Sequence, residues 1–205
     1  FNGKNLGFAG GMNVGLRLAE APYVCLINND CIVTDGWLEE MIALASSDKK
    51  IGLVCPESNN FGSGPSQDRS IEEHAVSLAS RKGEYIELGH AIFFACLIKK
   101  EVIDRIGILD EAYAGVCYED TDYSRRTLEA GYITALAKGA YVYHRMQASR
   151  KKLKGREAIY SRNRKLFEEK WGRIYRTLFT EECSSGTEGL RSLYELLKGF
   201  ARKRV

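Results

Sequence analysis

The 205-residue sequence lacks any uninterrupted apolar run of the ~18 residues that a membrane-spanning helix needs. Its longest apolar runs, 23–27 and 91–98, have only the length of strands. It also has no secretory signal at its start. With 44% hydrophobic and 28% charged residues, the composition excludes a disordered chain and is typical of a globular domain.

The six cysteines also lack the spacing of a metal or redox motif. None of the six belongs to a C-x-x-C pair, which excludes zinc-ribbon and thioredoxin spacing. Cys25, Cys55 and Cys96 lie inside apolar runs, where a free thiol behaves as a small hydrophobe. We therefore expect a reduced, cytoplasmic protein.

Internal repeats and low-complexity linkers are absent as well, which favours one domain with a helical C-terminal part. Short β-rich runs alternate with helical periodicity, and this pattern predicts an α/β fold. Strands are expected at 23–27, 51–55 (stopped by Pro56), 91–98, 132–136 and 140–143, with a turn at Lys138-Gly139. Helices are expected at 36–45, 99–106, 121–130, 156–171 and 189–201.

The charge is divided unevenly along the chain. Residues 1–144 hold 13 Lys and Arg against 20 Asp and Glu, whereas residues 145–176 hold 12 against 3. A short basic segment after an acidic body suits a polyanion, which can be a diphosphate, an anionic membrane surface or nucleic acid. Its aromatic residues have the helical spacing of a packed face, so we expect no nucleic acid.

Polar residues follow the first expected strand directly. Asn28, Asn29 and Asp30 stand at its carboxyl end, where open α/β sheets bind ligands. Their oxygens suit Mg²⁺ or Mn²⁺. The alternative is a polar turn that caps the next helix.

A second acidic group opens the helix expected at 121–130. Glu119, Asp120 and Asp122 crowd three carboxylates into four residues, which makes one of them a candidate general base. The alternative is an acidic helix start supported by Arg125 and Arg126.

Two weaker signals remain. His144 ends a strand-like run and is a candidate ligand, although a lone histidine is more often structural; His74 and His90 are interpreted as ordinary. The glycines at 7, 10, 11 and 15 fit neither a dinucleotide fingerprint nor a P-loop, but they permit close backbone approach to a ligand before a helix.

Taken together, the motifs resemble family 2 glycosyltransferases with the GT-A fold, and are most similar to bacterial rhamnosyltransferase and O-antigen type enzymes. The matching segments, in order, are 5–13, 26–30, 59–64 with Gln67, 107–111, 118–122 with Arg125, Gly131-Tyr132 and Tyr143-His144. The resemblance extends to about residue 172. It implies a mixed central sheet flanked by helices.

The resemblance also implies roles for individual residues. Asp30 and His144 would hold Mg²⁺ or Mn²⁺ on the donor diphosphate, and Asp120 would be the catalytic base, supported by Glu119 and Asp122. The donor would contact Asn5, Gly7, Gly10, Gly11, Asn13, Asn28 and Asn29. Asn28 replaces the first Asp of the family's D-x-D motif and would face the ribose.

The implied activity is metal-dependent, inverting transfer of a sugar from a nucleotide-sugar donor to a glycan or lipid-linked acceptor, in cell-surface polysaccharide synthesis. The basic segment, with Arg145, Arg150, Lys151 and Lys152, would close over the diphosphate or contact the inner face of the cytoplasmic membrane.

The family's first strands, which bind the base of the nucleotide, would precede Phe1. The resemblance therefore implies a truncated catalytic domain over residues 1–176 and a helical extension over residues 177–205. The alternative is a catalytically incompetent fragment that binds a nucleotide or a partner protein.

Overall fold

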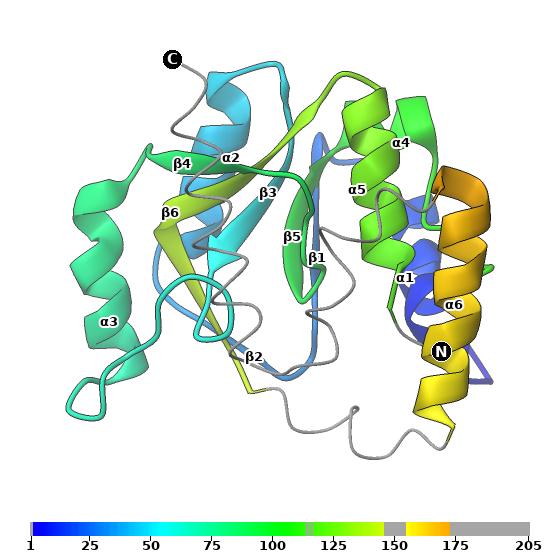
Figure 1. Ribbon diagram of the computed structural model, residues 1–205. Helices are drawn as coiled ribbons and strands as arrows, with labels where there is room; N and C mark the ends of the chain where they lie inside the picture. The colour runs from blue at the N-terminus through cyan, green and yellow to red at the C-terminus, as the bar shows by residue number, and fades with distance from the viewer. Residues whose placement is uncertain (1, 114, 116, 146–154, 173–205) are drawn as a thin grey trace.

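The computed structural model describes residues 2–113, 115, 117–145 and 155–172. It is a mixed sheet flanked by helices, as expected (Figure 1). The helix expected at 189–201, the proposed extension and two stretches of the basic segment (146–154 and 173–176), which include Arg150, Lys151 and Lys152, lie outside these residues. None of the helices in the described part is long and apolar enough to cross a bilayer.

Five strands form the path β1-β5-β3-β6-β2, and β4 pairs with β6 beside it. Their bounds are Tyr23–Ile27 (β1), Cys31–Val33 (β2), Ile51–Glu57 (β3), Tyr85–Leu88 (β4), Ala95–Lys99 (β5) and Ile133–His144 (β6). The β3–β6 pair is parallel and every other pair is antiparallel.

Helices cover both faces of the sheet. They are α1 (Gly7–Leu18), α2 (Trp37–Ser47), α3 (Ile71–Leu78), α4 (Lys100–Ile106), α5 (Glu119–Glu129) and α6 (Arg156–Trp171), with a 3-10 turn at Ala79–Arg81. Neighbouring residues of a strand point to opposite faces. Cys96 and Ile98 of β5 therefore pack with α1, α4 and α5, while Leu97 packs with α2.

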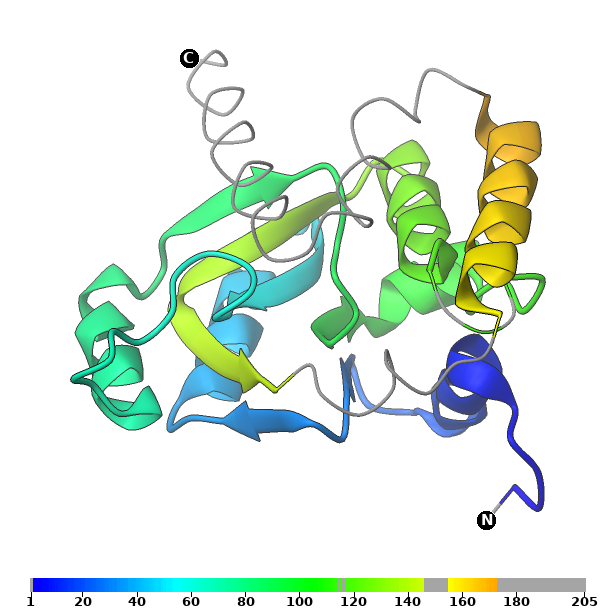
Figure 2. The same ribbon diagram turned by 60° about the horizontal axis from the view of Figure 1, so that its bottom comes forward.

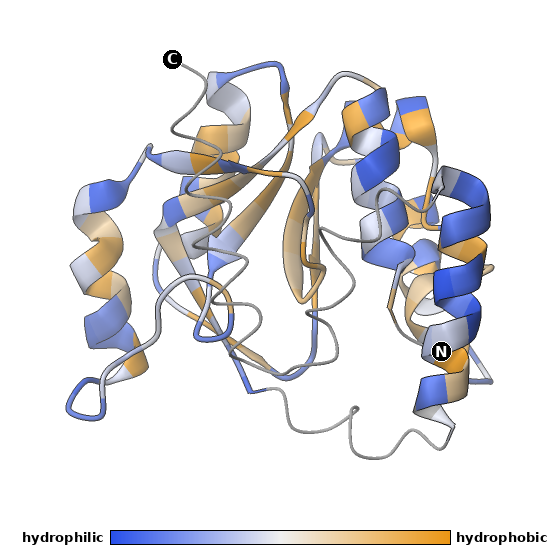
Figure 3. Cartoon of the chain, viewed as in Figure 1, coloured by the Kyte–Doolittle hydropathy of each residue, from blue (hydrophilic) through white to orange (hydrophobic). Residues whose placement is uncertain are grey.

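The outer helix α6 lies against α5 on the side away from the sheet (Figure 2). The central strands are largely apolar, whereas α6 is hydrophilic along much of its length (Figure 3). Its apolar contact is a small cluster in which Phe167 packs on Tyr113 and Tyr118. The domain thus has a main core around the sheet and a satellite core beneath α6.

Some expectations from the sequence need correction. Residues 7–13 form the first turns of α1 rather than a segment that precedes a helix. The apolar run 91–98 is a strand only from Ala95, because the preceding residues pass under α5, where the Ala91 amide donates to the Ser124 hydroxyl instead of to a strand. Pro56 lies within β3, next to a shift in its pairing with β6.

The two strands expected at 132–136 and 140–143 are one long strand, β6, without a turn at Lys138-Gly139. Gly139 is required for another reason: a Cβ there would lie 2.7 Å from the backbone of Lys82. The glycine permits this close approach at residues 138–140, where β6 shifts register against β3 before it continues to His144.

Candidate active site

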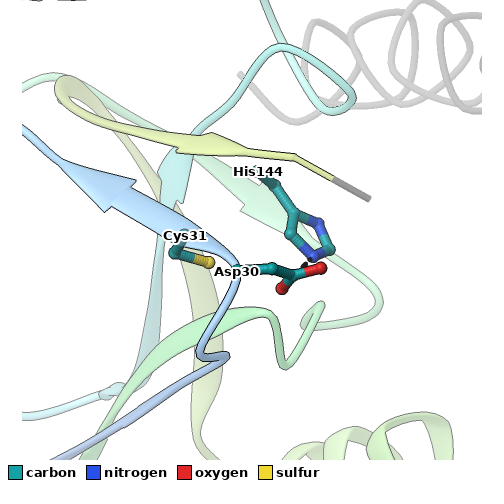
Figure 4. A group of neighbouring side chains, drawn as sticks. All are labelled: Asp30, Cys31 and His144. Carbon is teal, nitrogen blue, oxygen red and sulfur yellow. Dashed lines mark hydrogen bonds and ion pairs between the residues drawn. The ribbon is translucent and has the colours of Figure 1, made fainter. Parts of the chain in front are cut away.

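Asp30 and His144 lie together at one end of the sheet. Antiparallel pairing of β2 with β6 places Cys31 opposite His144, so that the preceding Asp30 faces the imidazole. The distance between His144 Nε2 and Asp30 Oδ1 is 3.1 Å (Figure 4). Both side chains are mostly buried. The structure thus joins the two residues that the resemblance assigns to the metal.

The donor set fits a divalent cation. Two ligands at right angles, each ~2.1 Å from a metal, are about 3 Å apart, which matches the separation of these two atoms. The Cys31 sulfur also lies within 4.8 Å of both ligand atoms. Its thiol donates weakly to the Phe94 carbonyl, and burial followed by the nearby Asp30 charge raises its pKa to about 11. A carboxylate and an imidazole are therefore the ligands ready for a metal.

Residues 28–31 form the turn that presents Asp30. The Cys31 amide donates to the Asn28 carbonyl, and the Asn28 amide donates to the Phe94 carbonyl at 2.7 Å. The turn leads into β2 and not into a helix, so the alternative of a helix-capping turn is wrong: α2 begins after Gly36.

The loop after β3 holds His144 in place. The Asn59 side chain accepts from the His144 amide at 2.8 Å and donates to its carbonyl at 3.1 Å. Asn60 lies beside the ring nitrogen Nδ1, and Phe94 stacks on the ring at 5.0 Å. These asparagines follow a strand at its carboxyl end, just as Asn28 does, and the same rule could have found them in the sequence.

Asp120 stands in the first turn of α5. Its Oδ1 accepts from the Thr121 amide at 2.8 Å and from the Thr121 hydroxyl at 3.3 Å. Its other oxygen, Oδ2, lies 3.8 Å from His90 Nε2, and the side chain is one-fifth exposed. Asp120 therefore has one oxygen bonded within its own helix turn and the other facing His90.

His90 is a residue that the sequence interpretation passed over as ordinary. A buried bridge brings it to Asp120: the Ala91 amide donates to the Ser124 hydroxyl, which donates to the Asp120 carbonyl at 2.7 Å. Burial lowers the pKa of His90, against an opposing contribution from Asp120. A neutral imidazole thus faces the carboxylate. In the sequence, the only signal for His90 was its position directly before the apolar run 91–98.

Glu119 is buried, unlike Asp120. Burial first, and repulsion by Asp120 second, raise the pKa of its carboxyl well above the usual range. Among the described residues, its Oε2 has no hydrogen-bond partner. The pair consequently divides into a buried carboxyl that favours its neutral form and a carboxyl that is partly exposed.

Asp122 faces away from Asp120. Its fully buried carboxylate accepts from Trp171 Nε1 at 2.8 Å, lies 2.8 Å from Lys170 Nζ, and pairs with Arg126 at 2.9 Å. An i,i+4 ion pair of the kind considered for this helix therefore forms between Asp122 and Arg126. The contacts of Asp122 hold α6 on α5.

One short segment connects the two groups. His90 contacts Asp120, and Phe94, four residues later, stacks on His144. Four residues span at most ~14 Å, so one short stretch of backbone contacts both the predicted base and the predicted metal ligand. These residues come from the ends of β1 and β6, the 58–61 turn and the start of α5.

The predicted donor residues of the glycine-rich segment are placed differently. Asn13 is fully buried. Its side-chain amide donates to the Leu109 carbonyl and to the Glu111 carboxylate, and it accepts from the Leu109 backbone amide. No polar atom of Asn13 remains exposed for a donor. Asn5 caps the Gly7 amide, and Gly10 packs against Leu6, whereas Gly11 borders open space.

Comparison with solved structures identifies the fold. The chain matches GalNAc-T7, crystallised with UDP, GalNAc and Mn²⁺, with a TM-score of 0.62 at 15% identity over 98% of this chain and 44% of that one. It matches a Pyrobaculum calidifontis mannosyltransferase in complex with GDP-Man and Mn²⁺ (0.54, 13%, 98% and 51%). It also matches S. aureus TarS in complex with UDP-GlcNAc (0.54, 12%, 100% and 56%). The fold is that of the GT-A glycosyltransferases.

The family follows from the sequence. A model described as glycosyl transferase family 2 matches residues 1–107, which is more than half of the chain. The chain therefore belongs to glycosyl transferase family 2, as the motifs indicated. A curated relative, the uncharacterized protein y4gI of Sinorhizobium fredii, is 27% identical over 155 residues, which cover 67% of this chain and 17% of the relative. The chain thus spans about half or less of the proteins it matches.

Proposed function

We propose that this chain contributes the metal-binding and general-base residues of an inverting glycosyltransferase, which moves a sugar from a nucleoside-diphosphate donor to an acceptor hydroxyl. The observation that carries the proposal is the meeting of Asp30 and His144 at 3.1 Å, with Asp120 at the other end of the 90–94 segment. Family membership and neighbours solved with UDP, GDP-Man or UDP-GlcNAc support the reaction class.

Asp30 Oδ1 and His144 Nε2 would hold Mg²⁺ or Mn²⁺; two of the neighbouring structures contain Mn²⁺. When bound, the cation supplies positive charge to the departing diphosphate. Asn59 and Phe94 orient His144 for this role by holding its backbone and its ring.

Asp120 Oδ2 takes the proton of the acceptor hydroxyl. As that oxygen forms its bond to the anomeric carbon, the bond from the same carbon to the diphosphate oxygen breaks, and its electrons leave with the diphosphate. Thr121 fixes the carboxylate through Oδ1, which leaves Oδ2 for the proton. A single displacement of this kind inverts the anomeric carbon.

The test uses the purified chain with a panel of UDP-, dTDP- and GDP-sugars and with Mn²⁺ or Mg²⁺. Water can replace the unknown acceptor, so release of the nucleoside diphosphate reports turnover. Proton NMR of the first sugar released should show the anomer opposite to that of the donor. Retention of configuration would overturn the displacement mechanism.

A second candidate function is a nucleotide-binding module without catalysis. The buried Asn13 side chain, whose polar atoms all bond within the chain, favours it. Metal-dependent donor binding without diphosphate release by any donor would support this function.

We also propose that the acceptor is a glycan or a lipid-linked glycan and that the reaction serves polysaccharide synthesis at the inner face of the cytoplasmic membrane. The proposed domain limits are 1–176 for the catalytic part and 177–205 for the extension.

A further inference from the structure

The His144 ring lies between two polar partners, one at each nitrogen. Nε2 is 3.1 Å from Asp30 Oδ1, and Nδ1 is 3.4 Å from Asn60 Nδ2. Stacking on Phe94, nearly parallel at 13°, fixes the plane of the ring. Two bonds from the Asn59 side chain fix its backbone. The position of the ring is therefore settled, and the position of its proton is the remaining variable.

The partner at Nδ1 determines that proton. A neutral imidazole has one N–H, and an amide nitrogen can only donate. With Asn60 Nδ2 donating to Nδ1, the proton of His144 stays on Nε2 and is donated to Asp30. A protonated Nε2 has no lone pair for a cation. Metal binding through Nε2 therefore requires the proton on Nδ1, and an oxygen of Asn60 facing it.

Ser58 allows this reversal. Its fully buried hydroxyl lies 2.8 Å from Asn60 Oδ1 and 3.1 Å from Asn59 Oδ1, and a hydroxyl both donates and accepts. After a half-turn of the Asn60 amide, Ser58 accepts from Nδ2 and donates to Asn59 Oδ1, while Asn60 Oδ1 accepts from His144 Nδ1. Ser58, Asn60 and the His144 Nδ1 atom thus remain hydrogen-bonded to one another in either state.

We propose that Ser58 and Asn60 form a reversible hydrogen-bond relay that sets the tautomer of His144. The proton is on Nε2 in the metal-free chain and on Nδ1 when a divalent cation occupies Nε2. One proton leaves Nε2 and one is taken up at Nδ1, so the proton count of the ring does not change. The relay rests on the proposed metal site, and Asn60 is a positioning residue within it.

The tautomer can be read directly by two-bond ¹H–¹⁵N NMR on the ¹⁵N-histidine-labelled chain at about pH 8, where an ordinary imidazole is neutral. His144→Gln identifies the signal. We expect the Nε2–H form without metal and the Nδ1–H form with Zn²⁺, a diamagnetic probe. The same tautomer in both conditions would overturn the relay.

Asn60→Asp sharpens the test, because a carboxylate only accepts and should impose the Nδ1–H form without any cation. Asn59→Asp is the matched control: it adds the same charge to the same turn, but next to the His144 backbone. We expect it to leave the metal-free ring in the Nε2–H form. A shift of the tautomer in both variants would show a charge effect and contradict the relay.

Cation affinity gives an independent readout, measured by electron paramagnetic resonance of free Mn²⁺. Asn60→Leu should weaken binding about 10- to 100-fold. Ser58→Ala should also weaken it, although every ring contact remains. Gln67→Ala, in the exposed part of the same loop, should not. Unchanged affinity in both Ser58→Ala and Asn60→Leu would overturn the relay.

Failure of the relay differs from failure of the proposed function. If wild-type chain binds no Mn²⁺, the metal site is wrong and the relay, which exists only to serve it, is overturned with it. If Mn²⁺ binds and the tautomer does not change, only the relay is wrong. Circular dichroism of each variant identifies any that do not fold, and the unsubstituted chain still tests the tautomer.

Discussion

Asp30 and His144 are 114 positions apart and meet because β2 pairs with β6, whereas Glu119, Asp120 and Asp122 share one turn of α5. The long-range pair converges on one point. The local group diverges: Glu119 is buried, Asp120 faces His90, and Asp122 faces α6. Sequence proximity is therefore a poor guide to which side chains meet in space here, and topology is a good one.

The largest effect is expected at Asp120. Asp120→Asn removes the proton acceptor and should lower turnover about 10²- to 10⁴-fold, with donor and Mn²⁺ binding retained. Diphosphate release measures turnover, and calorimetry measures binding. Asp104→Asn, an exposed carboxylate of α4, serves as control and should turn over normally. Near-normal turnover of Asp120→Asn would show that Asp120 is not the general base, and no carboxylate of α5 would then have a catalytic role.

Asp122 should affect stability instead. Asp122→Ala leaves Lys170 and Arg126 without their buried partner and should lower the free energy of unfolding by about 3 kcal/mol. Urea unfolding followed by tryptophan fluorescence measures this change. Asp104→Ala, which breaks an exposed i,i+4 pair, should cost at most ~0.5 kcal/mol. Equal costs for the two variants would contradict a structural role for Asp122.

On the long-range side, Asp30→Asn should weaken Mn²⁺ binding about 100-fold while the fold persists. The exposed Asp35 lies in the next turn of the chain, so Asp35→Asn is the matched control with unchanged affinity. Mn²⁺ resonance titration gives both values. If Asp30→Asn binds Mn²⁺ as wild type does, Asp30 is not a metal ligand and its contact with His144 has another role.

The effect expected at Glu119 is a pH dependence of stability, which changes only gradually from one pH unit to the next. Because the folded-state pKa is raised, the native chain binds more protons than the unfolded chain above about pH 4.3, so this stabilisation is complete below that pH and is lost as pH rises. Glu119→Gln removes the titration. Its stability relative to wild type should therefore increase as pH rises above about 4.3, by up to ~1.4 kcal/mol per pH unit until the folded-state carboxyl also loses its proton. Urea unfolding at several pH values measures the difference in stability between Glu119→Gln and wild type. A difference that stays constant with pH would contradict the prediction.

Local patterns were enough for much of the fold. The strand at 23–27, the helices near 37–47, 100–106 and 156–171, and the mixed α/β class follow from periodicity. The continuity of β6 could not be predicted, because Gly139 serves a close approach to Lys82 and not a turn. The three-residue β2 is also too short to show a period.

The same division holds for the site. Strand-end position and the family resemblance predicted the Asp30 and His144 pair, which the structure brings together. His90 was missed, since its importance depends on which residue faces it after folding. Asn60 was missed as well, although its place just after β3 could have marked it. Asp122 stood in the right motif, and only its contacts with α6 reveal what its carboxylate holds.

The unbroken course of β6 has a consequence for how the site opens. His144 is the last residue of a strand whose earlier residues pair with β3 and β4 in the core. Its amide also bonds to Asn59, so local opening at His144 must break that bond and the β2–β6 pairing together. Hydrogen exchange at His144 should then be slow and close to that of the central strands. Any motion that admits a donor would have to come from elements other than β6.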